Sequence, residues 1–88
     1  MSVRRFDPAP ILHLWCDRHG QPQTFIRCRR TRVVAAINHR WTIKTEWWRG
    51  TDEAIDRCYY DLATRDGLRC VIFHDAVAEV WHLESVYD

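Results

Sequence analysis

Thiols and imidazoles are the side chains best suited to nucleophilic or metal chemistry, and this 88-residue chain has four cysteines and five histidines. A zinc knuckle needs two ligands at a C-x-x-C or similar spacing, and Cys16-x-x-His19 is only half of such a site. No spacing brings a thiol beside an imidazole, and the hairpin register derived below puts Cys58 and His74 on opposite faces. We therefore expect free thiols, no metal, no cofactor and no enzyme.

Carboxylates would support acid–base catalysis only if two of them faced each other across a substrate. Asp61 is expected to point outward and Asp75 to open a turn, so neither serves this purpose. Glu46 is different, because it lies in residues 41–50, which hold three of the five tryptophans. Its carboxylate is expected to join a structural ion pair or cluster, with a functional site as the alternative. The expected members of this cluster are Glu46, Arg49, Arg57, Trp41 and Trp81.

Arginines indicate a different kind of site, a nucleic-acid interface. Four of them fall within residues 27–32, and exposed aromatic side chains such as Trp15 would stack on bases while guanidinium groups hold phosphates. The alternative is a solvated arginine face with the indoles in the core, which the net charge of only +1 favours. The expected contact residues are Arg27, Arg29, Arg30, Arg32, Arg40, Trp47 and Trp48.

Charge is unevenly divided along the chain. Residues 1–50 hold ten Lys and Arg against three Asp and Glu, whereas residues 51–88 hold three against nine. One explanation is that basic and acidic strands lie side by side and pair their charges across the sheet. The other is a two-sided fold whose basic side meets nucleic acid or an acidic protein. We expect the first arrangement and leave the second open.

The elements that position these residues must form in a short chain, which buries only about 60–65% of its unfolded surface. Large aromatic side chains supply buried area economically, so we expect a single β domain over residues 11–88, curled around the tryptophans. Residues 1–10 are basic and interrupted by prolines, and are expected to form a flexible arm. The sequence shows neither a membrane-spanning apolar run nor a signal-peptide pattern, so we expect a cytoplasmic protein without membrane contact.

Apolar and alternating runs predict the strands. Residues 11–16 and 23–30 flank a segment that contains Gly20 and Pro22, and they predict a first hairpin. Residues 31–43 predict the longest strand, and their β-branched content makes a helix over 32–39 the weaker alternative. The odd-numbered residues from Val33 to Ile43 are nearly all apolar and are expected to face the core.

The clearest local signal is Asp66-Gly67 between two apolar runs, which predicts a hairpin with a two-residue turn. That turn sets the register, and the pairs it predicts are Leu62 with Val71 and Tyr60 with Phe73. These four side chains are expected to form one core face.

Residues 80–87 predict the last strand, with Trp81 beside Phe73 and Leu83 beside Val71, which requires an odd number of loop residues. The sum is an all-β fold. We expect a single small antiparallel meander of about five or six strands, curled into a barrel or half-barrel that shelters its edges. One helical turn at 51–56 is compatible with this arrangement.

Beyond these patterns, the chain resembles a small bacterial domain of unknown function. The likeness covers roughly residues 24–88, and such domains occur as free-standing proteins and near the C-terminus of Y-family polymerase-like proteins from mutagenesis cassettes. The resemblance implies a link to DNA repair or translesion replication, and it attaches no catalytic role to any residue. The residues that carry it are Trp41-x-Ile43-x-x-Glu46-Trp47-Trp48-Arg49, Ile55-x-Arg57-x-Tyr59-Tyr60-x-Leu62, Asp66-Gly67, Phe73-x-Asp75, Trp81 and Val86-Tyr87-Asp88.

Two hypotheses for function follow. The first is a non-enzymatic binding module that contacts single-stranded or duplex DNA through the arginines. The second is a protein-interaction module with a purely structural tryptophan cluster, which self-associates or docks on a polymerase-like partner. A continuous exposed arginine stripe would favour the first hypothesis, and basic strands interleaved with acidic ones would favour the second.

Overall fold

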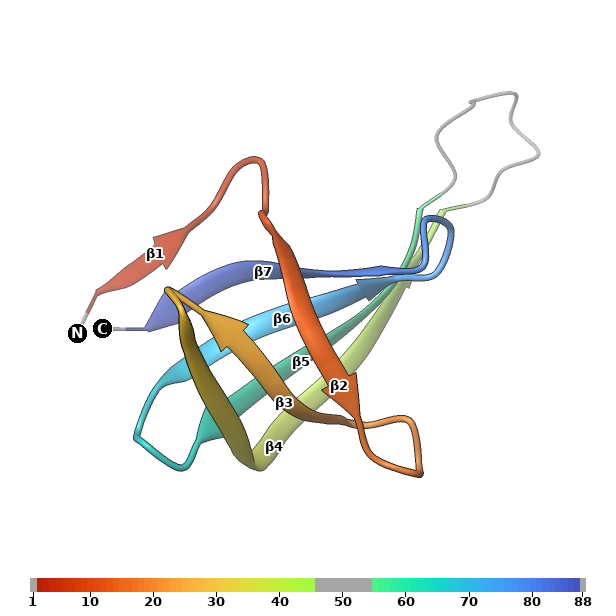
Figure 1. Ribbon diagram of the computed structural model, residues 1–88. Coiled ribbons are helices and arrows are strands. Elements are labelled where there is room, and N and C mark those ends of the chain that lie inside the picture. The colour runs from red at the N-terminus through yellow and green to blue at the C-terminus, as the bar shows by residue number, and fades with distance from the viewer. Residues whose placement is uncertain (1, 46–54, 88) are drawn as a thin grey trace.

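The computed structural model describes residues 2–45 and 55–87, and this part of the chain forms seven β-strands and no helix (Figure 1). Strands β2 to β7 pair antiparallel in chain order, and β7 pairs back onto β2, which closes a six-stranded barrel. The predicted all-β barrel is confirmed. The strands are β1 (Val3–Arg5), β2 (Ile11–Cys16), β3 (Pro22–Arg27), β4 (Arg30–Lys44), β5 (Asp56–Thr64), β6 (Arg69–Asp75) and β7 (Val80–Tyr87).

Three further predictions concern individual elements: the first hairpin, the longest strand and a helical turn. The predicted first hairpin corresponds to β2 and β3, and the predicted longest strand corresponds to β4. Most of the helical turn expected at 51–56 lies outside the described residues, and Asp56 already belongs to β5.

The segment expected to be an arm carries strand β1, which pairs with the last residues of β7, from Val3 opposite Tyr87 to Arg5 opposite Ser85. Strands β1 and β2 therefore share β7, because β2 pairs with Trp81 and His82 near its other end. A strand edge that β2 leaves free can accept another segment by backbone pairing. Residues 3–5 are thus part of the sheet rather than of an arm.

Strand β4 is long enough to belong to both sides of the barrel, since its first residues pair with β3 and the remainder pairs with β5. Its pairing with β5 is interrupted between Val34 and Ala36 and again between Ile37 and His39. Each bulge adds a residue and reverses which parity faces inward. The prediction of one buried parity along β4 is therefore wrong, and Trp41 lies outside with 36% of its surface exposed.

The Asp66-Gly67 hairpin forms between β5 and β6, but residues 65–67 make a three-residue loop rather than a two-residue turn. The N–H of Thr64 donates to the carbonyl of Leu68 over 2.8 Å, and Gly67 adopts a φ of 91°. A type I turn followed by a left-handed glycine is a common three-residue solution. The backbone conformation that favours glycine is thus used, one position away from the predicted geometry.

This extra loop residue shifts the register of the hairpin by one. A shift of one residue moves every side chain of a strand to the other face. Val71 and Phe73, which were expected in the barrel core, therefore lie on the outer face in a separate cluster with Tyr59. The observed pairs are Leu62 with Cys70 and Tyr60 with Ile72.

The predicted register of the last hairpin, between β6 and β7, is also wrong by one residue. Residues 76–79 connect β6 to β7, so the loop has an even number of residues. The Asp75 carboxylate accepts hydrogen bonds from two N–H groups of this loop at 3.0 and 3.2 Å, which helps to fix its length. Trp81 consequently lies opposite His74 rather than Phe73, and Leu83 lies opposite Ile72.

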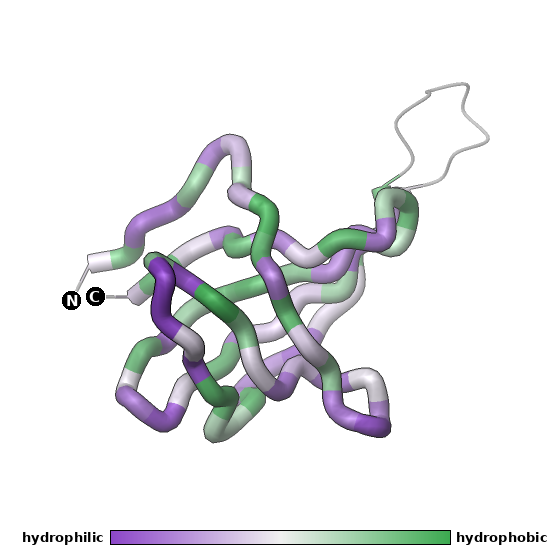
Figure 2. The backbone as a smooth tube through the Cα atoms, in the orientation of Figure 1, coloured by the Kyte–Doolittle hydropathy of each residue, from purple (hydrophilic) through white to green (hydrophobic). Residues whose placement is uncertain are grey.

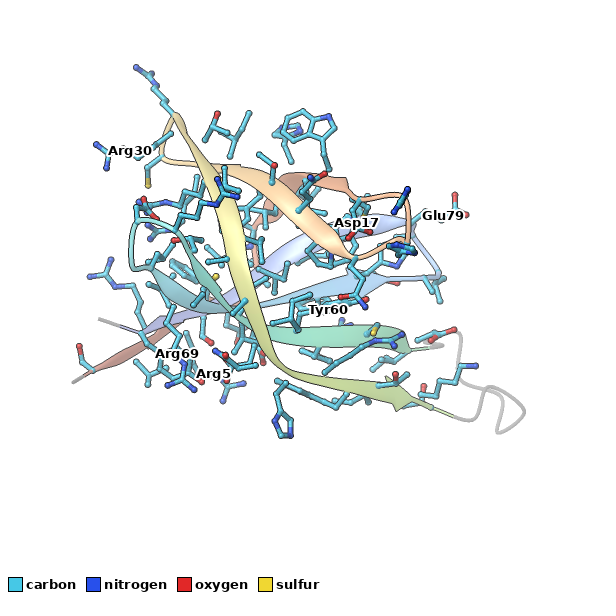
Figure 3. All side chains as sticks on the ribbon, turned by 90° about the horizontal axis from the view of Figure 1, so that it is seen from below. Arg5, Asp17, Arg30, Tyr60, Arg69 and Glu79 are labelled. Atoms are coloured by element: carbon cyan, nitrogen blue, oxygen red, sulfur yellow. The ribbon has the colours of Figure 1, made fainter. Side chains whose placement is uncertain are left out.

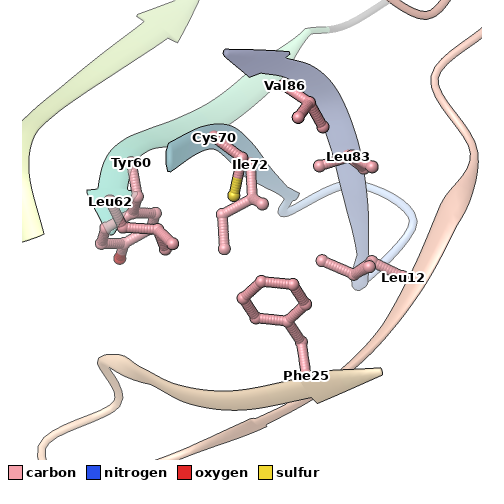
Figure 4. Packing of buried hydrophobic residues seen from close by; sticks show 8 residues of the cluster. All are labelled: Leu12, Phe25, Tyr60, Leu62, Cys70, Ile72, Leu83 and Val86. Atoms are coloured by element: carbon pink, nitrogen blue, oxygen red, sulfur yellow. The ribbon is translucent and has the colours of Figure 1, made fainter. Parts of the chain in front are cut away.

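Aliphatic side chains, the rings of Phe25 and Tyr60 and the thiol of Cys70, rather than indoles, fill the barrel (Figure 4). Trp81 packs only at the margin of this core, while Trp15 and Trp41 are exposed. The expectation of a core curled around the tryptophans is therefore wrong for the three indoles that the structure describes. The core residues are Leu12, Phe25, Tyr60, Leu62, Cys70, Ile72, Leu83 and Val86.

Candidate functional site

Four arginines gather where β3 turns into β4, and we call Arg27, Arg29, Arg30 and Arg32 the arginine corner. Arg27 and Arg30 pair with each other, so Cys28 and Arg29 alone form the turn. Both turn residues have positive φ angles, 52° and 63°, as a type I′ turn requires. This tight connection holds the cations at one end of the barrel, where Figure 2 shows a strongly hydrophilic stretch and Figure 3 labels Arg30.

One of these arginines has a structural role. Arg32 places its Nη1 2.5 Å from Oδ2 of Asp66, and only 14% of its side chain is exposed. The Thr64 hydroxyl donates to the same carboxylate. This hydrogen bond and the charge of Arg32 lower the pKa of Asp66, against the opposing effect of desolvation. Arg32 therefore links β4 to the β5–β6 loop.

The other three arginines of the corner differ from Arg32 in their ion pairing. Among the described residues, Arg27, Arg29 and Arg30 form no ion pair. Their guanidinium groups keep the capacity to bind phosphate oxygens.

Arg40 was expected with this group, and the structure places it elsewhere. It lies ten residues beyond Arg30 on β4, past both bulges. Its Nε donates to Sγ of Cys58 over 3.2 Å, and its Cζ lies 5.8 Å from the ring centroid of Tyr60. Arg40 is thus a neighbour of a thiol rather than a member of the arginine corner.

The hairpin of β2 and β3 carries an exposed aromatic surface next to the corner. Trp15 is 54% exposed and lies opposite Thr24, and His13 lies opposite Ile26. These side chains alternate along the strands with buried Leu12 and Phe25, which explains why they face solvent. We call Ile11, His13, Trp15, Thr24 and Ile26 the outer β2–β3 face.

The β2–β3 hairpin, residues 11–27, holds two arginines, Arg18 and Arg27, and a single acidic side chain, Asp17, and Arg29 and Arg30 follow it directly. The Asp17 carboxylate accepts hydrogen bonds from the N–H groups of His19 and Gln21 at 2.8 and 3.0 Å, which shape the β2–β3 turn. The bond from Gln21 is the largest cause of a lowered pKa for Asp17. Arg18, the exposed residue next to Asp17, adds a cation in the same turn, and Figure 3 shows Asp17 at the end of the hairpin away from Arg30.

The two charge arrangements weighed from the sequence are therefore both present. Ion pairs join β4 to the acidic side, Lys44 with Asp56 at 3.9 Å and Arg32 with Asp66. The β2–β3 hairpin forms no ion pair with another strand among the described residues. Strand β3 lies between β2 and β4, and β2 meets the acidic half of the chain only where Ile11 and Leu12 pair with β7. A basic side of the barrel remains where these strands are.

The expected tryptophan cluster does not assemble from the described residues. Trp41 stacks on Tyr59 with ring centroids 5.3 Å apart and planes 4° apart, on the outer face. Trp81 lies against Tyr60 and His74 on the inner face, with centroids 5.5 and 4.8 Å apart. Trp41 and Trp81 are therefore on opposite faces of the sheet.

The other expected members of the cluster have different outcomes. Arg57 places its Cζ 4.7 Å from the Phe73 ring centroid, and it forms no ion pair with a described residue. Four residues of the prediction lie outside the described part of the chain, namely Glu46, Trp47, Trp48 and Arg49.

The outer face of β4–β7 also carries a row of rings that the predicted register did not indicate. The rings of Trp41, Tyr59, Phe73 and His82 follow one another with centroids 5.3, 5.0 and 4.9 Å apart; the first and last pairs are stacked and the middle pair is tilted. A pocket of about 680 Å³ lies between this row and residues 5–9. Tyr59 and Phe73 are only 6% and 4% exposed, so their rings are not open for stacking with a ligand.

A second group that the sequence missed surrounds Cys58. The observed register makes Cys58 and His74 direct cross-strand neighbours, so the prediction that they lie on opposite faces is wrong. The same inner face brings Tyr60 and Trp81 close to them. A correct hairpin loop length was the only signal that could have found this group.

Comparisons with known proteins add no further constraint. No protein-family model, no curated protein and no solved structure matches this chain. Within residues 2–45 and 55–87, no three His, Cys, Asp or Glu side chains gather as a metal site would require. The same part of the chain has no helix that could cross a bilayer. The resemblance to the mutagenesis-cassette domain stays a prediction.

Proposed function

We propose that this protein binds single-stranded nucleic acid on the outer β2–β3 face, with Arg27, Arg29 and Arg30 of the arginine corner holding the phosphates. The observation that carries the proposal is an exposed indole, Trp15, on a hairpin with cations at both ends. The single carboxylate of that hairpin, Asp17, is engaged in a turn.

Each part of this surface has a role in such binding. An exposed indole stacks on any base, which contributes about 1–3 kcal/mol per base in single-strand binding. His13 offers a second flat ring on the same strand and face. Arg29 and Arg30 at one end and Arg18 at the other supply charge for the backbone. Six residues of strand extend about 20 Å, which is long enough for several stacked nucleotides.

Single strands fit this surface better than duplex. The base edges of a duplex are read by elements that enter a groove. The outer β2–β3 face presents flat rings instead, and these need unpaired bases.

The experiment is an anisotropy titration of a labelled oligothymidine with the whole protein at several salt concentrations. We expect affinity to fall with salt, with a logarithmic slope of about −0.7 for each phosphate contact. The double variant Arg29→Glu/Arg30→Glu should lower both the affinity and that slope. Unchanged anisotropy at low salt would remove the proposal.

A matched control separates local contact from overall charge. The double variant Arg5→Glu/Lys44→Glu makes the same charge change at two exposed residues away from the corner. Arg5 lies on β1, and Lys44 lies at the far end of β4. We expect it to lose much less affinity than the corner variant. Equal losses would mean that net charge, rather than the arginine corner, governs binding.

A second candidate function rests on the apolar part of the same face. Ile11, Trp15 and Ile26 are 65%, 54% and 37% exposed, and clustered exposed apolar side chains are typical of protein contacts. Self-association or docking on a polymerase-like partner would use them. Light scattering of the wild type and of Ile11→Ser/Ile26→Ser tests this alternative, which a strictly monomeric mass would count against.

The setting we propose is DNA-damage tolerance in the bacterial cytoplasm, and it follows from the resemblance rather than from the site. Four unbridged cysteines support a reducing compartment. Single-stranded DNA is the form that repair and translesion replication expose, so the proposed ligand and the proposed setting agree.

A further inference from the structure

Cys58 lies between polar side chains of the two neighbouring strands. On the neighbouring strand β4, Arg40 donates its Nε hydrogen to Sγ over 3.2 Å. On the other side, His74 of β6 is the cross-strand partner of Cys58. Cys58 is half-buried, so part of the residue remains in contact with solvent.

The electrostatic consequence follows from these neighbours. Burial alone would raise the pKa of Cys58, but hydrogen bonds from Arg40, Tyr60 and Thr42 and the charge of Arg40 outweigh it and lower the pKa. The pKa of Tyr60 is raised to about 12, by burial first and then by the neighbouring sulfur. Tyr60 therefore stays protonated and remains a donor. A guanidinium is always charged and accepts no hydrogen bond, so Arg40 favours a thiolate.

The remaining cysteines differ in position and provide internal references. Cys70 is fully buried, and burial raises its pKa to about 12. Cys16 is exposed, and its pKa is raised by partial burial and then by the charge of Asp17. All four thiols are free. Leu62 rather than Cys58 pairs with Cys70, so a cross-strand disulfide between these two cysteines has no suitable geometry.

We propose that Cys58 is a modification site at which the protein forms mixed disulfides with small anionic disulfides, selected by Arg40. The Cys58 thiolate attacks one sulfur of the small disulfide, and the existing S–S bond breaks as the new one forms. The displaced thiolate leaves and takes a proton from solvent, so no electron is gained or lost overall. Arg40, freed from Sγ in the product, binds a carboxylate of the attached group.

The test compares two probes of opposite charge, glutathione disulfide and cystamine, on the whole protein. Digestion and mass spectrometry then give a separate rate for each cysteine. We expect Cys58 to react faster with glutathione disulfide than Cys16 does, by about three- to tenfold for each unit by which its pKa is lowered. Cystamine should show no such preference for Cys58.

Variants at Arg40 assign the selectivity. Arg40→Gln should slow the reaction of Cys58 with glutathione disulfide and leave the rates at Cys16 and Cys28 unchanged. Arg40→Lys keeps a charge and should restore part of the rate. Unfolding curves of the variants confirm that they are folded, since Arg40 is exposed.

Two results would overturn this proposal. One is a Cys58 rate no higher than that of Cys16, and the other is a rate that Arg40→Gln leaves unchanged. Faster reaction with cystamine than with glutathione disulfide would refute the anionic selectivity. None of these three results bears on the proposed nucleic-acid binding, which uses a different surface.

Discussion

Nη1 of Arg32 lies 2.5 Å from Oδ2 of Asp66, and this ion pair connects the first residues of β4 to the loop between β5 and β6. It pairs one cation of the arginine corner and leaves Arg27, Arg29 and Arg30 without a partner among the described residues. The stability of the barrel and the free charge of its basic end therefore depend on neighbouring positions at the β3–β4 connection.

The first prediction concerns this ion pair. The pKa of Asp66 is lowered in the folded protein, so its ionised form adds stability above the ordinary value of about 3.9. That contribution is lost as pH falls through the lowered pKa. Asp66→Asn should lower the urea midpoint near neutral pH, and the difference from wild type should shrink in acid. Urea unfolding at several pH values measures this. The control Lys44→Gln breaks an exposed pair and should change little.

The second prediction concerns the turn of the arginine corner. Arg29 has a φ of 63°, a conformation that costs a non-glycine residue about 1 kcal/mol and costs glycine almost nothing. Arg29→Gly should therefore raise the free energy of unfolding by about 1 kcal/mol while weakening oligothymidine binding. Arg29→Ala keeps the strained backbone and should weaken binding without stabilising the fold. If both variants have the stability of the wild type, the turn is not strained.

The third prediction tests which aromatic residues form the core. Phe25 has no exposed surface, so Phe25→Ala should lower the free energy of unfolding by about 3–5 kcal/mol. Trp15 is 54% exposed, and Trp15→Ala should stay within about 0.5 kcal/mol of wild type while it weakens binding of oligothymidine. Denaturant unfolding of the two variants distinguishes a phenyl-centred core from one built on this indole.

The fourth prediction is the pH dependence of alkylation by iodoacetamide. Thiolates react and thiols do not, so the rate at each cysteine follows its ionisation. Cys58, with a lowered pKa, should reach half of its maximal rate at a lower pH than an unperturbed thiol, and Cys16, with a raised pKa, should reach it at a higher pH. Tyr60→Phe removes a donor and should move the Cys58 profile to higher pH. A Cys58 profile at or above that of Cys16 would contradict the structure.

The strands and the hairpins follow from sequence patterns, and their register does not. Asp66-Gly67 fits a two-residue turn and a three-residue loop equally well, since both use a left-handed glycine. The packing of distant residues decides between them, because Ile72 fills the core beside Phe25 and Phe73 does not. The bulges in β4 likewise have no local signal. Between them the odd-numbered Ile37 faces inward, whereas Val34 before them and Arg40 after them hold the inward positions, so Trp41 lies on the outer face.

The candidate site was predictable to the extent that it is local. Arg27, Arg29 and Arg30 remain together because a two-residue turn connects them. Arg40 follows the same pattern in the sequence, but ten strand residues and two bulges separate it from the corner. The pairing of Cys58 with His74 depends on the loop at residues 65–67, so an error of one residue there concealed it.

Strand β1 and the closed ring of β2–β7 should differ in their resistance to mechanical force. Val3 and Tyr87 are paired neighbours on antiparallel strands, and the start of β1 lies beside the end of β7 in Figure 1. A force that pulls Val3 away from Tyr87 would act on the β1–β7 backbone hydrogen bonds one after another, starting at this pair. Residues 3–5 should therefore detach under a small load, while the ring of β2–β7 stays closed.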